Sequence, residues 1–249
     1  MYYELFCTFA AMQALETTKI KAIVLDADDT LWDCQSHFEH VENRLYELIA
    51  PYCDNPAAEL YETESHNMAD LGYGCKAFTI SVMETALRVC GEQVTARQLA
   101  ELLEAGKGLL QLPATPLPGV VETLEKLHAA RHERGFRLVL FTKGELQDQE
   151  NKLYRSGLDR YFDHVEITSN KTEQEFRQLC RHLDISPEEM LMVGNSLKSD
   201  IAPALAIGAR AVHIPFHVTW QLEVHEDIKH PNMVEIERFE QLPEVLGWA

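Results

Sequence analysis

The stretch Ile20-Lys21-Ala22-Ile23-Val24-Leu25-Asp26-Ala27-Asp28-Asp29-Thr30 decides the expected fold. Its first six residues are rich in apolar and β-branched side chains, which is typical of a short buried strand. The apolar run stops at Asp26, so the strand is expected to end on an acidic turn.

Beyond about residue 116 the chain alternates short apolar runs with amphipathic segments. Further strands are expected at 138–141, 164–167, 190–193, 211–214 and 234–236, with helices between them and a closing helix at the end. Short buried strands that alternate with helices predict a parallel sheet with helices on both faces and right-handed crossovers. The predicted fold class is therefore α/β, a doubly wound, Rossmann-like parallel sheet.

Between the first strand and this alternating part, residues 34–112 show only the apolar spacing of helices. The segment 112–119 then brings three prolines and one glycine within eight residues, which predicts a stiff linker. We therefore expect residues 1–33 and 113–249 to form the core and residues 34–112 to form a small all-helical cap domain.

The composition excludes several classes of protein. The 249 residues are 46% hydrophobic and 25% charged, which is ordinary for a globular chain and excludes a disordered or collagen-like one. Lys+Arg 22 against Asp+Glu 40 leaves a net charge of −18, so neither nucleic acid nor an anionic membrane surface is an expected partner.

The cysteines and the N-terminal stretch bear on the compartment. Six dispersed cysteines without a C-x-x-C pair indicate free thiols in a reducing compartment, and we expect a cytoplasmic location. The apolar stretch from Leu5 to Leu15 is interpreted as a non-secretory leader, because no basic residue precedes it and no clear cleavage site follows.

Ligands of a doubly wound sheet bind beyond the carboxyl ends of its strands, so the residues there form the candidate site. Asp26 and Asp28 follow the first strand two residues apart and can aim at one point. A strand-end carboxylate can serve as a nucleophile and its neighbour as a general acid/base. A solvated acidic turn explains the same residues.

Three later strand ends add further candidates. Thr142-Lys143-Gly144 is either a phosphate-binding corner or a capped turn. Lys171, near a helix start, can neutralise an anion or lie on the surface, and Asp200 is either a site carboxylate or a helix N-terminal acid. The ordered set of carboxylate, hydroxyl, ammonium and carboxylate on four strand ends is far more specific than any one of them.

Together these segments resemble the four motifs of the haloacid dehalogenase-like (HAD) superfamily. The matching segments are Asp26-x-Asp28-x-Thr30, Thr142, Lys171 and Gly194-Asn195-Ser196-x-x-Ser199-Asp200, in that order. The resemblance runs from about Lys19 to the end of the chain, and the insert at 34–112 is similar in position to the family's cap, which closes over the active site. The fourth motif usually carries an aspartate where this chain has Asn195.

The resemblance implies a Mg²⁺-dependent phosphatase that acts on a small phosphate monoester. Asp26 would form an aspartyl-phosphate, and Asp28 would be the general acid/base, for which its pKa should be raised. The phosphoryl group would contact Thr142, Lys143, Gly144 and Lys171. Mg²⁺ would be held by the Asp26 and Asp200 carboxylates and the Asp28 main-chain carbonyl, while Asn195 could supply a neutral oxygen ligand or hold a metal-bound water. Metal affinity is expected to be lower than is usual in the family.

The insert is expected to choose the substrate. Tyr73 and Lys76, in a turn flanked by glycines, are candidate contacts to the leaving group, although a tight turn alone also explains the glycines. Trp32 is expected to pack where insert and core meet. Four alternatives stay open: a phosphomutase, a dehalogenase, a phosphonatase with Lys76 as Schiff-base lysine, and a non-catalytic binding protein prompted by Asn195. Neither the substrate nor the oligomeric state is predicted.

Overall fold

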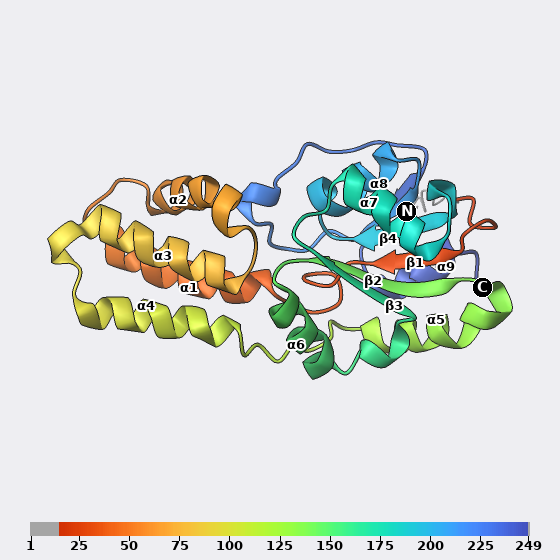
Figure 1. Ribbon diagram of the computed structural model, residues 1–249, viewed down its shortest axis with the longest axis horizontal. Coiled ribbons are helices and arrows are strands. Elements are labelled where there is room, and N and C mark those ends of the chain that lie inside the picture. The colour runs from red at the N-terminus through yellow and green to blue at the C-terminus, as the bar shows by residue number, and fades with distance from the viewer. Residues whose placement is uncertain (1–14, 249) are drawn as a thin grey trace, which may run out of the picture.

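The computed structural model describes residues 15–248, and the strands found there form one six-stranded sheet (Figure 1). The strands are β1 (Ala22–Leu25), β2 (Arg137–Lys143), β3 (His164–Thr168), β4 (Met190–Gly194), β5 (Arg210–His213) and β6 (Met233–Glu235). Their spatial order is β3-β2-β1-β4-β5-β6, and every neighbouring pair is parallel. This confirms the predicted α/β class with a doubly wound parallel sheet.

Both faces of the sheet are covered by helices, as the unbroken apolar run of β1 requires. The core helices are α5 (Val120–Arg134), α6 (Leu146–Ser156), α7 (Glu173–Leu183), α8 (Ala202–Ala206) and α9 (Leu242–Val245). Ile23 and Leu25 belong to the apolar cluster that contains Leu124 of α5, while Val24 belongs to the cluster that contains Phe176 of α7. Alternate side chains of a strand point to opposite faces, so both sets of residues must be apolar.

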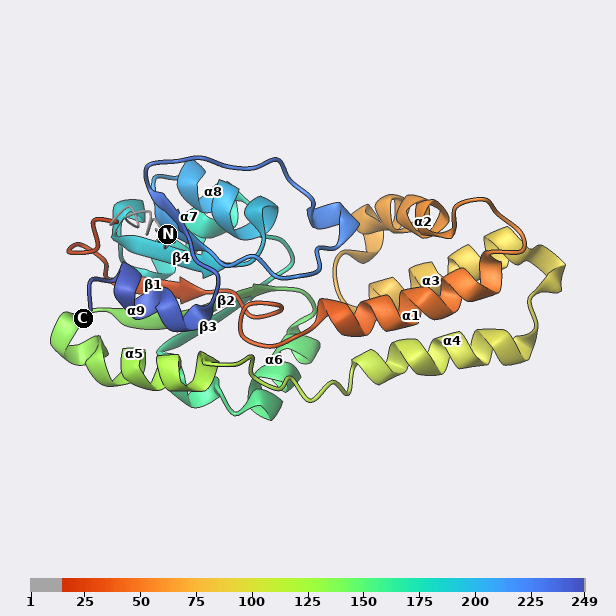
Figure 2. The same ribbon diagram turned by 180° about the vertical axis from the view of Figure 1, so that it is seen from behind.

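Four helices between β1 and β2 form a bundle of their own at one end of the molecule (Figures 1 and 2). They are α1 (Gln35–Ile49), α2 (Pro56–Leu71), α3 (Cys75–Cys90) and α4 (Ala96–Leu109), and we call residues 34–112 the helical insert. The insert has a separate apolar cluster, which includes Leu45, Ile49, Leu60 and Val82. The insert therefore buries apolar side chains of its own, apart from the two clusters of the sheet.

The segment after β5 runs back toward the insert (Figure 2). We call residues 214–232 the β5–β6 loop; its short helical turn, η5 (Gln221–Glu223), lies against α2. The remaining turns are η1 (Gly91–Gln93), η2 (Asp159–Tyr161), η3 (Pro187–Glu189), the π-helical η4 (Leu197–Ile201) and η6 (Phe239–Gln241). The expected edge strand near residues 234–236 is β6, and the expected closing helix is η6 followed by α9.

Two expectations concern the rest of the chain. The interpretation of the stretch from Leu5 to Leu15 lies almost wholly outside the described residues, which begin at position 15. The cysteines at positions 34, 53, 75, 90 and 180 are free thiols, and all but Cys53 are buried. From residue 15 to residue 248, none of the helices combines the length and the hydropathy that crossing a bilayer requires.

Candidate active site

Two buried carboxylates share one buried ammonium group at the carboxyl end of the sheet. Lys171 Nζ lies 2.7 Å from Asp200 Oδ1 and also donates to Asp26 Oδ1. The exposed fractions of these residues are 4% for Lys171, 1% for Asp200 and 6% for Asp26. Asp26 directly follows β1, and Asp200 follows β4, its neighbour in the sheet. The structure thus brings together three residues that the sequence analysis had placed on separate strand ends.

The charges of this cluster do not balance. Burial and the neighbouring Asp200 carboxylate raise the pKa of Asp26, while Lys171 acts in the opposite direction. Burial works against the charge of Lys171, but the two carboxylates outweigh it and raise the pKa of that ammonium group. When both acids are ionised, two negative charges face one positive charge, which leaves room for a further cation.

The donor set fits a hard divalent cation such as Mg²⁺, which prefers oxygen ligands. Carboxylate oxygens come from Asp26 and Asp200, and a neutral oxygen comes from Asn195, whose Oδ1 accepts a hydrogen bond of 3.3 Å from Thr30 Oγ1. Over the described part of the chain, no group of three or more His, Cys, Asp or Glu side chains is placed to hold a metal. A bound Mg²⁺ would therefore depend on main-chain, amide or water oxygens for its other ligands.

Asp28 lies among hydrogen-bond donors, and this overturns the expectation that its pKa is raised. Lys152 Nζ lies 2.7 Å from both carboxylate oxygens, Trp32 Nε1 donates at 2.7 Å and Gln149 Nε2 at 2.8 Å. Burial alone would raise the pKa of Asp28, but Lys152 and the hydrogen bonds outweigh it, so the pKa is lowered. The expectation failed because it considered the acidic turn without the ammonium group that packs onto it.

Helix α6 supplies Gln149 and Lys152, which the sequence analysis missed. Both are buried, and they lie three residues apart on the face that also buries Leu153. The pattern that could have indicated them is a lysine and a glutamine at helical spacing on an apolar face. Gly144 has a φ of +135°, which glycine adopts more readily than other residues. Its missing side chain also lets Gln149 approach, because a Cβ there would lie 3.0 Å from Gln149 Nε2.

Lys152→Met is expected to lower the free energy of unfolding by about 3 kcal/mol at neutral pH, because it leaves the partly buried Asp28 carboxylate without its counter-ion. The lowered pKa of Asp28 stabilises the wild type above the usual pKa of an aspartate and ceases to do so as the pH falls below it. In the variant, burial raises this pKa, so ionisation of Asp28 costs stability as the pH rises. The difference should therefore shrink toward about pH 4.

Urea unfolding of both proteins at neutral and acidic pH measures this difference. Lys126→Met, an exposed position on α5, is the matched control and should unfold like the wild type at both pH values. An equal loss of stability at both pH values would contradict the role given to the ion pair.

The end of β2 is also built into the site. Thr142 is buried and lines the cavity described below. Lys143 Nζ donates to Ser199 Oγ at 2.7 Å and to the Glu223 carboxylate, and it lies 4.0 Å from the centre of the Tyr73 ring. Glu223 belongs to η5 and was also missed. The predicted phosphate-binding lysine is thus held by an acid from the β5–β6 loop.

The turn after β1 also orients the insert. Asp29 has a φ of +62°, in the left-handed region, and its Oδ1 accepts the N–H groups of Cys34 and Gln35 at 2.8 and 2.9 Å, where α1 begins. Burial raises the pKa of Asp29 to about 7. Trp32 is 1% exposed and forms an isolated antiparallel β-bridge with Pro116. The two chain segments that connect the core to the insert therefore contact each other there. This confirms the packing role expected of Trp32.

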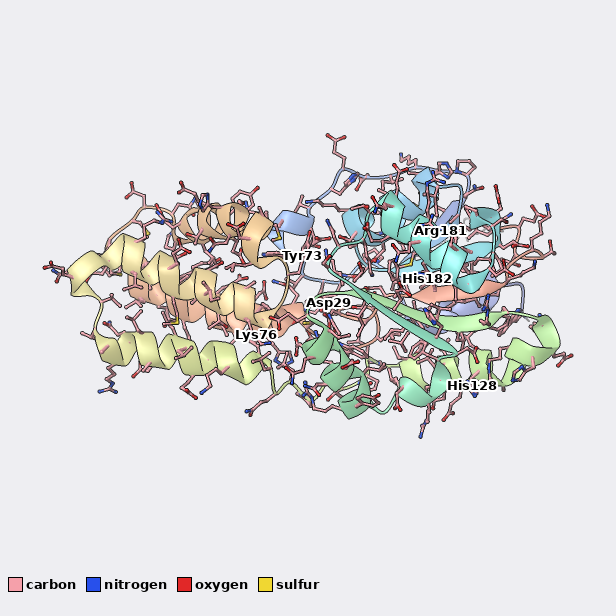
Figure 3. All side chains as sticks on the ribbon, viewed as in Figure 1. Asp29, Tyr73, Lys76, His128, Arg181 and His182 are labelled. Atoms are coloured by element: carbon pink, nitrogen blue, oxygen red, sulfur yellow. The ribbon has the colours of Figure 1, made fainter. Side chains whose placement is uncertain are left out.

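A cavity of about 340 Å³ lies between the end of the sheet and the insert. Asp26, Thr142, Lys171 and Asp200 line it on the core side, and Tyr73 lines it on the insert side. Lys76 is not among its lining residues, and its half-exposed side chain pairs with Glu145. Figure 3 shows Tyr73, Asp29 and Lys76 at the junction of insert and core.

Gly194, the last residue of β4, lies directly against the Asp200 side chain. A Cβ on Gly194 would lie 2.3 Å from Asp200 Oδ2, so only a glycine lets Asp200 fold back against the end of β4. The main-chain N–H of Ser196 donates to the same oxygen at 3.0 Å. Asp200 is therefore held at both oxygens, one by Lys171 and one by this turn.

A doubly wound sheet with a carboxylate–lysine–carboxylate cluster at its carboxyl edge and a cavity beside it defines the class as an α/β enzyme. The family model for haloacid dehalogenase-like hydrolases matches residues 20–208. The chain therefore belongs to the haloacid dehalogenase-like hydrolase family and is a hydrolase of that family.

Individual relatives agree with this assignment. The chain is 25% identical to a glyceraldehyde 3-phosphate phosphatase of Methanothermobacter thermautotrophicus over 91% of this chain and 100% of the relative. A haloacid dehalogenase-like family hydrolase from Xanthomonas campestris has a similar structure, with a TM-score of 0.82, 29% identity and 95% of each chain covered. A 2-haloacid dehalogenase from Pseudomonas syringae has a TM-score of 0.59 at 25% identity, covering 92% of this chain and 100% of that one.

Proposed function

We propose that this protein is a Mg²⁺-dependent phosphatase that hydrolyses small phosphate monoesters through an aspartyl-phosphate on Asp26. The observation that carries the proposal is the contact of Lys171 with both Asp26 and Asp200 in the lining of the cavity. A phosphate ester and a carboxylate nucleophile are both anions, so their approach needs positive charge, which Lys171 supplies in part and a bound divalent cation would complete. The similarity to a phosphatase over 91% of the chain supports the same reaction.

In this mechanism Asp26 attacks phosphorus, so that a bond from its carboxylate oxygen forms while the bond to the leaving oxygen breaks. Lys171 and Thr142 hold the phosphoryl oxygens in line for the attack. Bound Mg²⁺, held by Asp26, Asp200 and neighbouring oxygens, would supply charge compensation for the phosphoryl group. Water then attacks phosphorus of the aspartyl-phosphate, which releases phosphate and restores Asp26.

Asp28 is the general acid/base of the proposed mechanism. Its carboxylate form, favoured by Lys152, suits the second step, in which Asp28 takes a proton from the attacking water. In the first step it gives to the leaving oxygen the proton that it took from water in the preceding turnover, which requires that its contacts with Lys152 change so that it stays protonated until substrate binds. Trp32 and Gln149 would keep its position during that exchange.

We further propose that residues 34–112 act as a cap domain that encloses the substrate. The support is the cavity itself, whose lining comes from the core and, in the insert, from α1, α2, α3 and the turn between α2 and α3. The points at which the chain passes between core and insert, near residues 33 and 113, are the expected hinges, and Asp29 and Trp32 brace one of them.

Dehalogenation on the same aspartate is the main alternative within the family, and a dehalogenase is among the similar structures. Attack on a neutral carbon centre needs no metal and no second acid close to the nucleophile. Here Asp200 is buried beside Asp26 and raises its pKa, and Asp28 follows two residues after the nucleophile. Dehalogenation leaves both of these further acids without a role. The site therefore favours phosphoryl transfer.

The proposal is tested with 4-nitrophenyl phosphate as a generic substrate. Turnover is expected with millimolar Mg²⁺ and should fall at least about 100-fold in excess EDTA, because the charge on the phosphoryl group is then no longer balanced. Activity should return when Mg²⁺ is added back. Full activity in excess EDTA would contradict the metal role, and the absence of any phosphate release with Mg²⁺ would refute the proposed function.

The variant Asn195→Asp tests whether Asn195 limits the affinity for Mg²⁺. The substitution adds a carboxylate beside the proposed metal ligands and keeps an acceptor for Thr30. We expect the variant to reach half-maximal activity at a lower Mg²⁺ concentration than the wild type does. An unchanged or higher Mg²⁺ requirement would show that Asn195 does not limit metal affinity.

A further inference from the structure

One side of the cavity is lined by the insert and the β5–β6 loop. Phe38 of α1, Met68 of α2 and Phe78 of α3 give this side apolar surface, together with Trp220 of the loop. Glu64 of α2 also lines it and is 6% exposed. This side would receive the alcohol part of a substrate whose phosphate sits at Asp26.

The lysines of the cavity lining are all on the core side and are already paired. Within the described residues, the lining contains three lysines and no arginine. Lys143 is paired with Glu223, Lys152 with Asp28, and Lys171 with the two acids of the central cluster. A second anionic group on the substrate would therefore meet no unpaired lysine or arginine among these lining residues.

Glu64 is a carboxylate that a cationic group of the substrate would stabilise. Trp220 Nε1 donates to its Oε2 at 3.2 Å, and this is its one hydrogen bond among the described contacts. Burial raises the pKa of Glu64 to about 7, and the carboxylate of Glu42 acts in the same direction. A neighbouring cavity of about 140 Å³ shares Glu64 and Trp220 and adds Glu39 and Glu42, so the surroundings on that side are acidic as well.

We propose that Glu64 determines specificity by selecting phosphate monoesters whose alcohol part joins apolar surface to an amine or hydroxyl group and by rejecting those with a second anionic group. An ammonium group beside Glu64 would gain a charge-assisted hydrogen bond with a carboxylate that is otherwise poorly solvated. A carboxylate or second phosphate there would be repelled at short range with little screening. This inference rests on the proposed phosphatase function, because it assumes that the phosphate occupies the Asp26 end.

Three benzyl phosphates that differ only in the para substituent test the proposal: aminomethyl, hydroxymethyl and carboxylate. Their leaving alcohols are similar, so differences in kcat/KM report on the distant group. At about pH 8, where Glu64 is mostly ionised, the aminomethyl ester should exceed the carboxylate ester by about tenfold or more, the size of one hydrogen bond to a charged group. The hydroxymethyl ester should lie between them.

Glu64→Gln should bring the ratio of amine to carboxylate close to one, because the amide has a similar shape and no charge. Glu62→Gln is the matched control: its side chain is 77% exposed on the same helix, and the substitution should leave the ratio unchanged. Equal kcat/KM values in the wild type, or a ratio that Glu64→Gln does not alter, would overturn the proposal and leave the phosphatase function intact.

A binding experiment separates the two proposals if no ester is hydrolysed. Benzylphosphonates with the same three substituents cannot be turned over, and their affinities for the protein with Mg²⁺ can be measured by calorimetry. Tighter binding of the aminomethyl compound, lost in Glu64→Gln, would support the role of Glu64 even though the proposed reaction had failed. Equal affinities would overturn that role directly.

Discussion

Asp26→Asn is expected to abolish turnover, with kcat lowered by at least about 10⁴-fold, the scale seen when an enzyme loses its nucleophile. The amide cannot form the acyl-phosphate bond, although its shape is almost that of the carboxylate and it can still accept the hydrogen bond from Thr30. The variant also removes one of two buried negative charges that face each other, because Asp200 lies on the other side of Lys171. Its thermal stability should therefore equal or exceed that of the wild type.

Steady-state phosphate release and a thermal melt measure the two effects. Asp159→Asn, at an exposed position of η2, is the matched control and should keep wild-type turnover. Acid quenching of the wild type during turnover should trap a phosphorylated peptide that contains Asp26. Wild-type hydrolysis by purified Asp26→Asn would show that another group is the nucleophile.

Lys171→Met should lose both activity and stability. Its removal leaves Asp26 and Asp200 buried and adjacent without a counter-ion, which typically costs about 3–5 kcal/mol. In EDTA near pH 7 we expect a fall in Tm of roughly 10 °C for a chain of this size. Activity should fall about 10³-fold or more, because the ammonium group also holds the phosphoryl oxygens.

The expected cause of the lower stability is the unbalanced charge of Asp26 and Asp200, so another cation should restore part of the stability of Lys171→Met. Mg²⁺ should raise the Tm of Lys171→Met by more than it raises that of the wild type, because two carboxylates are then free to bind it. Lys171→Arg, which keeps the charge in a larger group, should unfold later than Lys171→Met in EDTA. A Lys171→Met protein that unfolds like the wild type in EDTA would mean that the two acids are not ionised together.

The architecture of the sheet was predictable from local patterns. The run from Ala22 to Leu25 is apolar at every position, which fits a strand that buries both faces, and it is the central strand β1. The three prolines between residues 112 and 119 indicated the return from the insert to the core. The weak apolar signal around residues 164–167 also proved to be a strand, β3. It lies at the edge of the sheet, where burial is incomplete.

The partners of the site residues were harder to predict. Lys152 meets Asp28 across 124 residues of sequence, Lys143 meets Glu223 across 80, and Trp220 meets Glu64 across 156. Each pair joins a residue on a regular element to one on another helix or on a loop. Nothing in the periodicity of either segment identifies the other, and the expected pKa of Asp28 was wrong for this reason.

Sequence patterns were sufficient for the class of fold, for the order of its strand ends and for the residues that those ends carry. The reason is that burial on both faces imposes an apolar run, and the end of each run marks where polar residues must emerge. Only the tertiary structure decided three further properties. These are the lowered pKa of Asp28, the pairing of Lys143 with Glu223 and the position of Glu64 in the cavity lining. These depend on which distant polar groups are excluded from water together, and hydrophobic periodicity carries no information about that pairing.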